Sequence, residues 1–132
     1  MGLPSTARRS LILLIVLLVS WDAYFPSPFG FETRPIASTS LIFGIPFFVA
    51  LFLNILAIPV LWKRPRIGSV FGILTAALMV LGVALDQTGF VVPGQLPPAI
   101  ISAFEAIDVI LSALVIKSCY TTYRHAKGAS TG

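Results

Sequence analysis

The chain has 132 residues, of which 57% are hydrophobic and only 11% are charged, and its formal net charge is +4. Soluble domains carry about a quarter charged residues, so this composition indicates a membrane protein and not a soluble domain. The basic residues stand in short clusters at the ends of apolar runs, which is typical of topology determinants and not of a nucleic-acid-binding face. The single cysteine, Cys119, excludes an internal disulfide or a redox pair.

Four apolar segments predict four transmembrane helices, at about 10–25, 39–62, 68–85 and 98–120. A membrane-spanning helix needs about 20 apolar residues, with a range of roughly 17–25. The second and fourth segments meet this requirement, the third is marginal and the first is short. We therefore predict an all-α fold, a single integral membrane domain covering residues 1–132 and built as an antiparallel up-down four-helix transmembrane bundle. Residues 127–132 are predicted to form a disordered tail.

The first segment also has features of a cleaved signal peptide. The basic pair Arg8–Arg9 precedes the apolar run Leu11–Val19, as an n-region precedes an h-region. No small-x-small cleavage triplet follows this run without including Trp21 or Asp22. We therefore predict that the first helix is retained.

The distribution of basic residues predicts the orientation. If the N-terminus is cytoplasmic, the outside loops carry only Arg34, and the other eight Lys and Arg residues all lie inside: Arg8, Arg9, Lys63, Arg64, Arg66, Lys117, Arg124 and Lys127. This is the positive-inside pattern. The expected location is the plasma (cytoplasmic) membrane, with both termini cytoplasmic. The expected partner is the lipid bilayer, and a homo-oligomer or a larger membrane complex stays open.

The fourth segment carries two acids on one helical face. At 100° per residue, Glu105, Asp108 and Ser112 fall within an arc of about 60°. A rise of about 1.5 Å per residue places Asp108 about 15 Å beyond Pro98, near the midplane of a hydrocarbon core about 30 Å thick. A carboxylate at that depth costs about 2.5–3.5 kcal/mol and by default indicates an ion or proton site, or a pairing site.

Three further sets of residues complete the predicted site. The same rise per residue nominates hydrogen-bonding support for the carboxylates at Ser112, Asn54, Thr75 and Ser20. Acids predicted near the outer surface form an outer acidic mouth that would attract cations, made of Asp22, Glu32 and Asp86. A row of small residues predicts close helix packing at Gly68, Gly72 and Ala76.

Two functions fit these features, beside a purely structural role for the acids as hydrogen-bonding groups between helices. The first is a small integral membrane protein whose Glu105–Asp108 pair binds a proton or cation, in transport. The alternative is a non-catalytic subunit or assembly factor whose carboxylates pair with a basic residue of another membrane protein. The sequence has no H-E-x-x-H, no G-x-S-x-G and no glycine-rich phosphate loop, so it does not predict an enzyme, a metal site or a cofactor.

Overall fold

The computed structural model describes residues 4–24, 41–89 and 96–130, with side chains described for 4–24, 44–89 and 96–126. The described residues are helical almost throughout. In chain order the elements are α1 (Ser5–Ser20), the short 3₁₀ helix η1 (Trp21–Tyr24), α2 (Leu41–Lys63), α3 (Pro65–Gln87) and α4 (Ala99–Ser130). The all-α fold with four helices is therefore confirmed.

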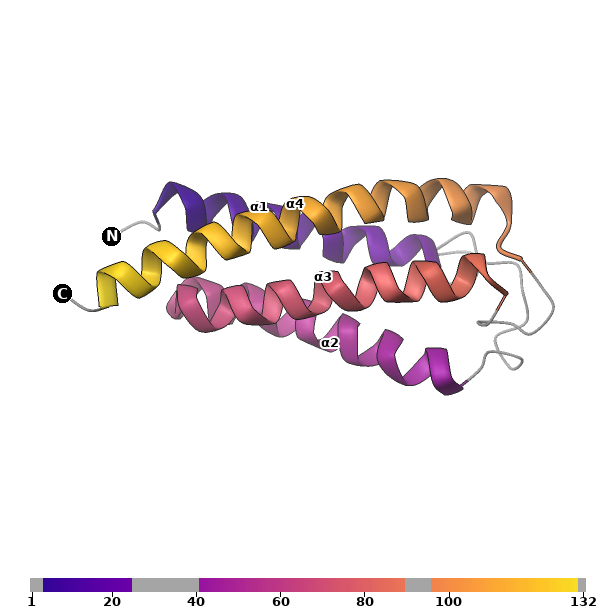
Figure 1. Ribbon diagram of the computed structural model, residues 1–132, viewed down its shortest axis with the longest axis horizontal. Helices are drawn as coiled ribbons and strands as arrows, with labels where there is room; N and C mark the ends of the chain where they lie inside the picture. The colour runs from indigo at the N-terminus through magenta and orange to yellow at the C-terminus, as the bar shows by residue number, and fades with distance from the viewer. Residues whose placement is uncertain (1–3, 25–40, 90–95, 131–132) are drawn as a thin grey trace.

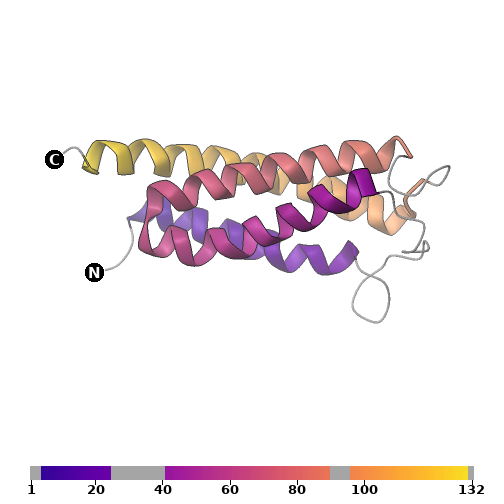
Figure 2. The ribbon, with the colours of Figure 1, turned by 90° about the horizontal axis from the view of Figure 1, so that it is seen from below.

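The four helices run antiparallel along one long axis (Figure 1). Within the described residues, each helix packs against the next one in the chain, and α4 also packs against α1. The two views agree that both chain termini lie at one end (Figure 2). We call this end, with the start of α1 and the α2–α3 turn, the termini end. The opposite end holds η1, the end of α3 and the start of α4.

The spacing of the buried residues explains the packing. On α4 they recur alternately every four and three residues, at Ile101, Glu105, Asp108, Ser112, Val115, Cys119 and Thr122. The same spacing links Ala7, Ser10, Leu14 and Leu17 on α1 and continues to Trp21 at the start of η1. A repeat of 3.5 residues keeps one seam of each helix facing its neighbours at a small crossing angle, as in left-handed bundles.

The bundle has polar groups inside and large apolar side chains outside. Asn54, Thr75 and Asp108 are 0% exposed, whereas Phe52 on the outer side of α2 is 63% exposed. Water-soluble proteins distribute these groups in the reverse way. Three described segments are long and apolar enough to cross a membrane: Gly44–Lys63, Pro65–Gln87 and Ala99–Ala126. Helix α1, with 16 residues, is not among them.

The helix bounds differ from the predicted segments mainly at the termini end. Helix α3 begins at Pro65, three residues earlier than predicted, because proline suits the first helical position, where its missing N–H costs nothing. Only Arg64 therefore separates α2 from α3. The backbone of α4 is helical through Ser130, whereas the sequence predicts a disordered tail from residue 127. No proline interrupts this last part of α4.

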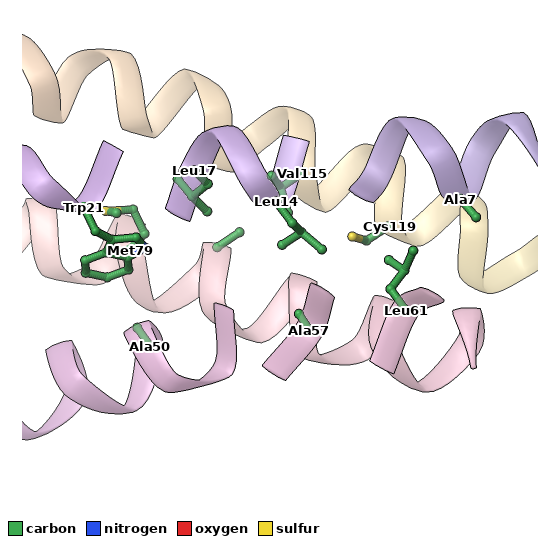
Figure 3. Close-up of a cluster of buried hydrophobic side chains, with 11 residues drawn as sticks. Ala7, Leu14, Leu17, Trp21, Ala50, Ala57, Leu61, Met79, Val115 and Cys119 are labelled. Carbon is green, nitrogen blue, oxygen red and sulfur yellow. The ribbon is translucent and has the colours of Figure 1, made fainter. Parts of the chain in front are cut away.

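Small residues let the helices approach closely. A Cβ on Gly68 would lie 2.2 Å from the backbone of Leu61, and a Cβ on Gly72 would lie 2.6 Å from Cys119 Sγ. The predicted packing row therefore faces neighbouring helices of the same chain, with Gly68 against α2 and Gly72 against α4. The apolar core around it includes Leu61 and Cys119 (Figure 3).

Candidate functional site

Asp108 is the centre of the candidate site. It lies on the inner seam of α4 and is 0% exposed. The Tyr24 hydroxyl, at the end of η1, donates a hydrogen bond to Asp108 Oδ2, and Ser20 also lies beside the carboxyl group. The other oxygen, Oδ1, is buried and has no hydrogen-bond partner in the described part of the chain. Asp108 therefore has one oxygen held by the protein and one oxygen with free lone pairs.

The position of Tyr24 depends on a second set of contacts, between η1 and α2. With the Asn54 amide oriented so that both of its atoms are bonded, Asn54 Oδ1 accepts from Trp21 Nε1 at 3.1 Å. Its Nδ2 donates to the Leu14 carbonyl, also at 3.1 Å. The Trp21 ring packs edge to face on Tyr24, with centroids 6.3 Å apart, and on Phe47, at 4.9 Å. Asn54 thus supports the site by fixing η1 and not by contacting Asp108.

Glu105 lies one helical turn closer to the opposite end and is 3% exposed. Gln87 Nε2, at the end of α3, donates to Glu105 Oε1 at 2.7 Å and to Ser102 Oγ at 3.1 Å. Asp86 is also buried, at 4% exposed. The carboxyl groups of Asp86 and Glu105 and the amide of Gln87 therefore all lie nearer the opposite end of the bundle than Asp108 does.

The remaining predicted residues occupy different positions. Thr75 donates to the Ala50 carbonyl at 2.6 Å and so joins α3 to α2. Ser112 is buried one turn from Asp108, and its hydroxyl has no partner in the described residues. Ser20 donates to the Leu17 carbonyl at 2.7 Å. Asp22 is exposed, so of the outer acidic mouth only Asp86 is buried, and Glu32 lies outside the described residues.

A second polar cluster was not predicted. At the termini end the Ser10 hydroxyl lies 2.7 Å from Ser118 Oγ and 2.9 Å from Thr122 Oγ1, joining α1 to α4. Along α4, Val115 lies between Asp108 and Ser118, and along α1, Leu14 lies one turn beyond Ser10. Both belong to the buried apolar core (Figure 3). The polar seam of the bundle is therefore interrupted near its middle.

The residues that sequence analysis missed gave weak signals. Nothing in the sequence relates Tyr24 to a carboxyl group 84 residues away. The hydroxyl cluster could have been predicted from helical periodicity. Ser10 lies four residues before the buried Leu14, and Ser118 and Thr122 lie three and seven residues after the buried Val115, so all three share a helical face with a core residue.

Charge is divided between the two halves of the bundle. The four described acids, Asp22, Asp86, Glu105 and Asp108, belong to η1, the end of α3 and the first half of α4, in the half nearer the opposite end. The described basic side chains belong to the half nearer the termini end: Arg8, Arg9, Lys63, Arg64, Arg66, Lys117 and Arg124. Among the described residues, no three His, Cys, Asp or Glu side chains gather closely enough to hold a metal ion.

No protein family, curated protein or solved structure matches this chain.

Proposed function

We propose that α1 and η1 together form a fourth membrane span. From Ser10, after the basic pair, the rest of α1 and the four 3₁₀ residues of η1 cover roughly 25 Å, short of the about 30 Å of a hydrocarbon core by an amount that local thinning of the bilayer can match. The outer side of α1 is apolar and exposed, like that of the three longer helices, at Ile12, Ile15, Val16 and Val19. Two basic residues at the start of α1, Arg8 and Arg9, would then lie in the headgroup region.

The charge division supports the orientation of the bundle. With the basic termini end in the cytoplasm, the chain follows the positive-inside rule of multi-pass proteins in the plasma membrane. The acidic half then faces the outside, where it attracts cations. In this orientation Asp86 and Glu105 lie between the outer surface and Asp108.

Within this frame, the protein binds a proton or a cation at Asp108, as part of transport across the membrane. One observation carries the proposal: Asp108 is fully buried, is oriented by Tyr24 through Oδ2, and has an unpartnered Oδ1. A carboxylate enclosed in this way is expensive to leave ionised and unpaired, so a proton or cation bound at Oδ1 stabilises it. Glu105, hydrogen-bonded to Gln87, modulates the charge of the entrance on the outer side.

For a bound ion to pass through the bundle, the apolar side chains Leu14 and Val115 would have to move apart. Leu14 and Val115 separate Asp108 from the hydroxyl cluster of Ser10, Ser118 and Thr122 at the termini end. With Asp108 0% exposed, the structure corresponds to a closed state, which would alternate with states open to the outer or the inner side. A second state would bring the inner hydroxyl groups into contact with the carboxyl group.

The alternative role, a subunit that pairs through the same carboxylates, fits the geometry less well. Asp108 and Glu105 are 0% and 3% exposed within this one chain. A basic side chain of another protein would reach Asp108 only if the helices of this bundle separated. Burial inside the chain therefore favours a small ligand such as a proton or a metal cation over a partner's side chain.

The test is ion flux into liposomes that contain the purified protein, with proton, Na⁺ and K⁺ gradients applied in turn. Asp108→Asn preserves the shape of the side chain and removes its charge, and we expect it to reduce flux to that of empty liposomes. Asp22→Asn is the matched control, because it makes the same change at an exposed carboxylate, and it should lower flux only slightly, through the loss of one attracting charge at the outer surface.

Equal flux for the Asp108→Asn variant and the unmodified protein would refute the proposal. A stoichiometric membrane partner that co-purifies in mild detergent, and that Asp108→Asn releases, would instead establish the subunit role.

A further inference from the structure

A second candidate site lies at the termini end, where α3 begins. A groove of about 540 Å³ is formed by the α2–α3 turn, the first two turns of α3 and the last part of α4. Its basic lining residues are Arg64 and Arg66, and Tyr123 of α4 forms the facing wall. None of these residues belongs to the carboxylate site, which lies in the other half of the bundle.

The arginine at the centre of the groove is held in place. Arg66 Nη2 donates to Tyr123 Oη at 3.1 Å, and its guanidinium carbon lies 5.0 Å from the centre of the Tyr123 ring. A guanidinium has five N–H donors in a fixed plane, so this contact leaves donors for a ligand. With Arg64 beside it, the groove presents two permanent positive charges suited to a phosphate group.

The groove continues into an apolar strip. Its floor includes Ile67 and Val70, and Leu74 follows one turn further along α3. All three are large apolar residues exposed on the outer side of the helix. In the proposed membrane orientation the arginines lie at headgroup level and the strip runs into the hydrocarbon core. A phosphate site joined to an apolar strip has the shape of a phospholipid.

We propose that this groove binds one anionic phospholipid of the cytoplasmic leaflet. Arg64 and Arg66 bind the headgroup phosphate, and an acyl chain lies along Ile67, Val70 and Leu74. Basic pockets between transmembrane helices on the cytoplasmic side bind anionic headgroups in this manner. The inference requires the bundle to span the membrane, but it does not require Asp108 to bind an ion.

The experiment measures lipid bound to the full chain in detergent by native mass spectrometry, as phosphatidylglycerol or phosphatidylcholine is added. The unmodified protein should retain one phosphatidylglycerol in preference to phosphatidylcholine. The Arg64→Gln/Arg66→Gln variant should lose this preference, with affinity for phosphatidylglycerol reduced by about tenfold or more. The Arg9→Gln/Arg124→Gln variant removes the same charge from the same end outside the groove, and it should bind as the unmodified protein does.

Three results would overturn the proposal. If both double variants lose the same amount of phosphatidylglycerol binding, the lipid is attracted by the general positive charge of this end and not by the groove. Displacement of the lipid by millimolar inorganic phosphate would show a free-phosphate site with no contribution from the acyl chain. The double variant Arg64→Gln/Arg66→Gln can fail to fold, and Val70→Trp then replaces it. This substitution fills the groove without changing its charge, so it should reduce phosphatidylglycerol binding. Unchanged binding by that variant would contradict the proposal.

Asp108→Asn serves as a further control, because it should leave lipid binding unchanged. Failure of the ion site and failure of the lipid site are therefore distinguishable.

Discussion

At the scale of single residues, the unequal environments of the two Asp108 oxygens are the central feature. Oδ2 accepts the Tyr24 hydroxyl, and Oδ1 has no described partner although it is buried. Natural proteins pair nearly all buried polar atoms, because an unpaired atom loses its hydration without compensation. An exception at a carboxyl group inside a membrane bundle points to a ligand and not to a structural hydrogen bond alone.

Tyr24→Phe tests the hydrogen bond that orients Asp108. The change keeps the aromatic ring against Trp21 and removes the Tyr24 hydroxyl that donates to Asp108 Oδ2. We expect the free energy of unfolding to fall by about 1–3 kcal/mol, because the buried carboxyl group loses the hydrogen bond that Tyr24 donates to Oδ2. Thermal unfolding in detergent, followed by circular dichroism, measures this change.

Tyr120→Phe is the matched control, since Tyr120 is exposed on the outer side of α4. The Tyr120→Phe variant should have the same free energy of unfolding as the unmodified protein. The stability loss from Tyr24→Phe should also shrink when that change is made in the Asp108→Asn protein, because the partner is then altered. Equal losses in the unmodified and the Asp108→Asn backgrounds would mean that Tyr24 acts through its packing alone.

The sequence predicts that Asp108, Glu105 and Ser112 share one helical face, because helical periodicity can be read within a single segment. The structure does bury all three on the inner seam of α4. Depth matching for Asn54 and Thr75 found buried residues but could not give their partners, since a rise per residue contains no information on which faces meet. The Tyr24 contact depends on η1, which brings the chain back over α4 after α1 ends.

At the scale of secondary-structure elements, close helix contacts position the site. Gly72 of α3 faces Cys119 of α4, and Gly68 faces the backbone of Leu61 on α2. These approaches fix α3 between its two neighbours, so that Gln87 at its end reaches Glu105. The geometry of the carboxylate site therefore depends on contacts several turns away.

Gly72→Ala tests this dependence. The new methyl group would lie 2.6 Å from Cys119 Sγ, so α3 and α4 must shift or the cysteine side chain must move. We expect a stability loss of about 1–3 kcal/mol, as for other overpacked contacts. Adding Cys119→Ala removes the sulfur atom, and it should restore most of the loss, measured again by thermal unfolding.

The control is Gly44→Ala on α2, where the new methyl group would meet nothing within 4 Å. This variant should be neutral or more stable by up to about 1 kcal/mol, because alanine favours helix over glycine. A Gly72→Ala protein as stable as Gly44→Ala, or a loss that Cys119→Ala does not relieve, would show that the α3–α4 contact is looser than described.

The long helices could be predicted because apolar length and proline-rich breaks are local signals. The exact bounds of α1 could not, since four of the five residues from Ser5 to Arg9 are polar or charged, and only the structure shows that Ala7 is buried and that Ser10 contacts α4.

At the scale of the whole molecule, the inverted distribution of polar and apolar groups unites these observations. Large apolar side chains cover the outside, and carboxyl, amide and hydroxyl groups lie along the inner seams. Such a bundle is stable in lipid, where polar groups must find partners inside the protein. The proposed ion site at Asp108 lies in this polar interior.

The central claim is that Asp108 is enclosed by the bundle while Asp22 is open to the outside. Sealed right-side-out membrane vesicles would be treated with a membrane-impermeant carbodiimide and an amine, and the modified peptides would be quantified by mass spectrometry. The proposal predicts modification of Asp22 and protection of Asp108, with Asp108 becoming reactive once the protein is denatured. Modification of Asp108 as fast as Asp22 in the native protein, or protection of both from the outside, would contradict it.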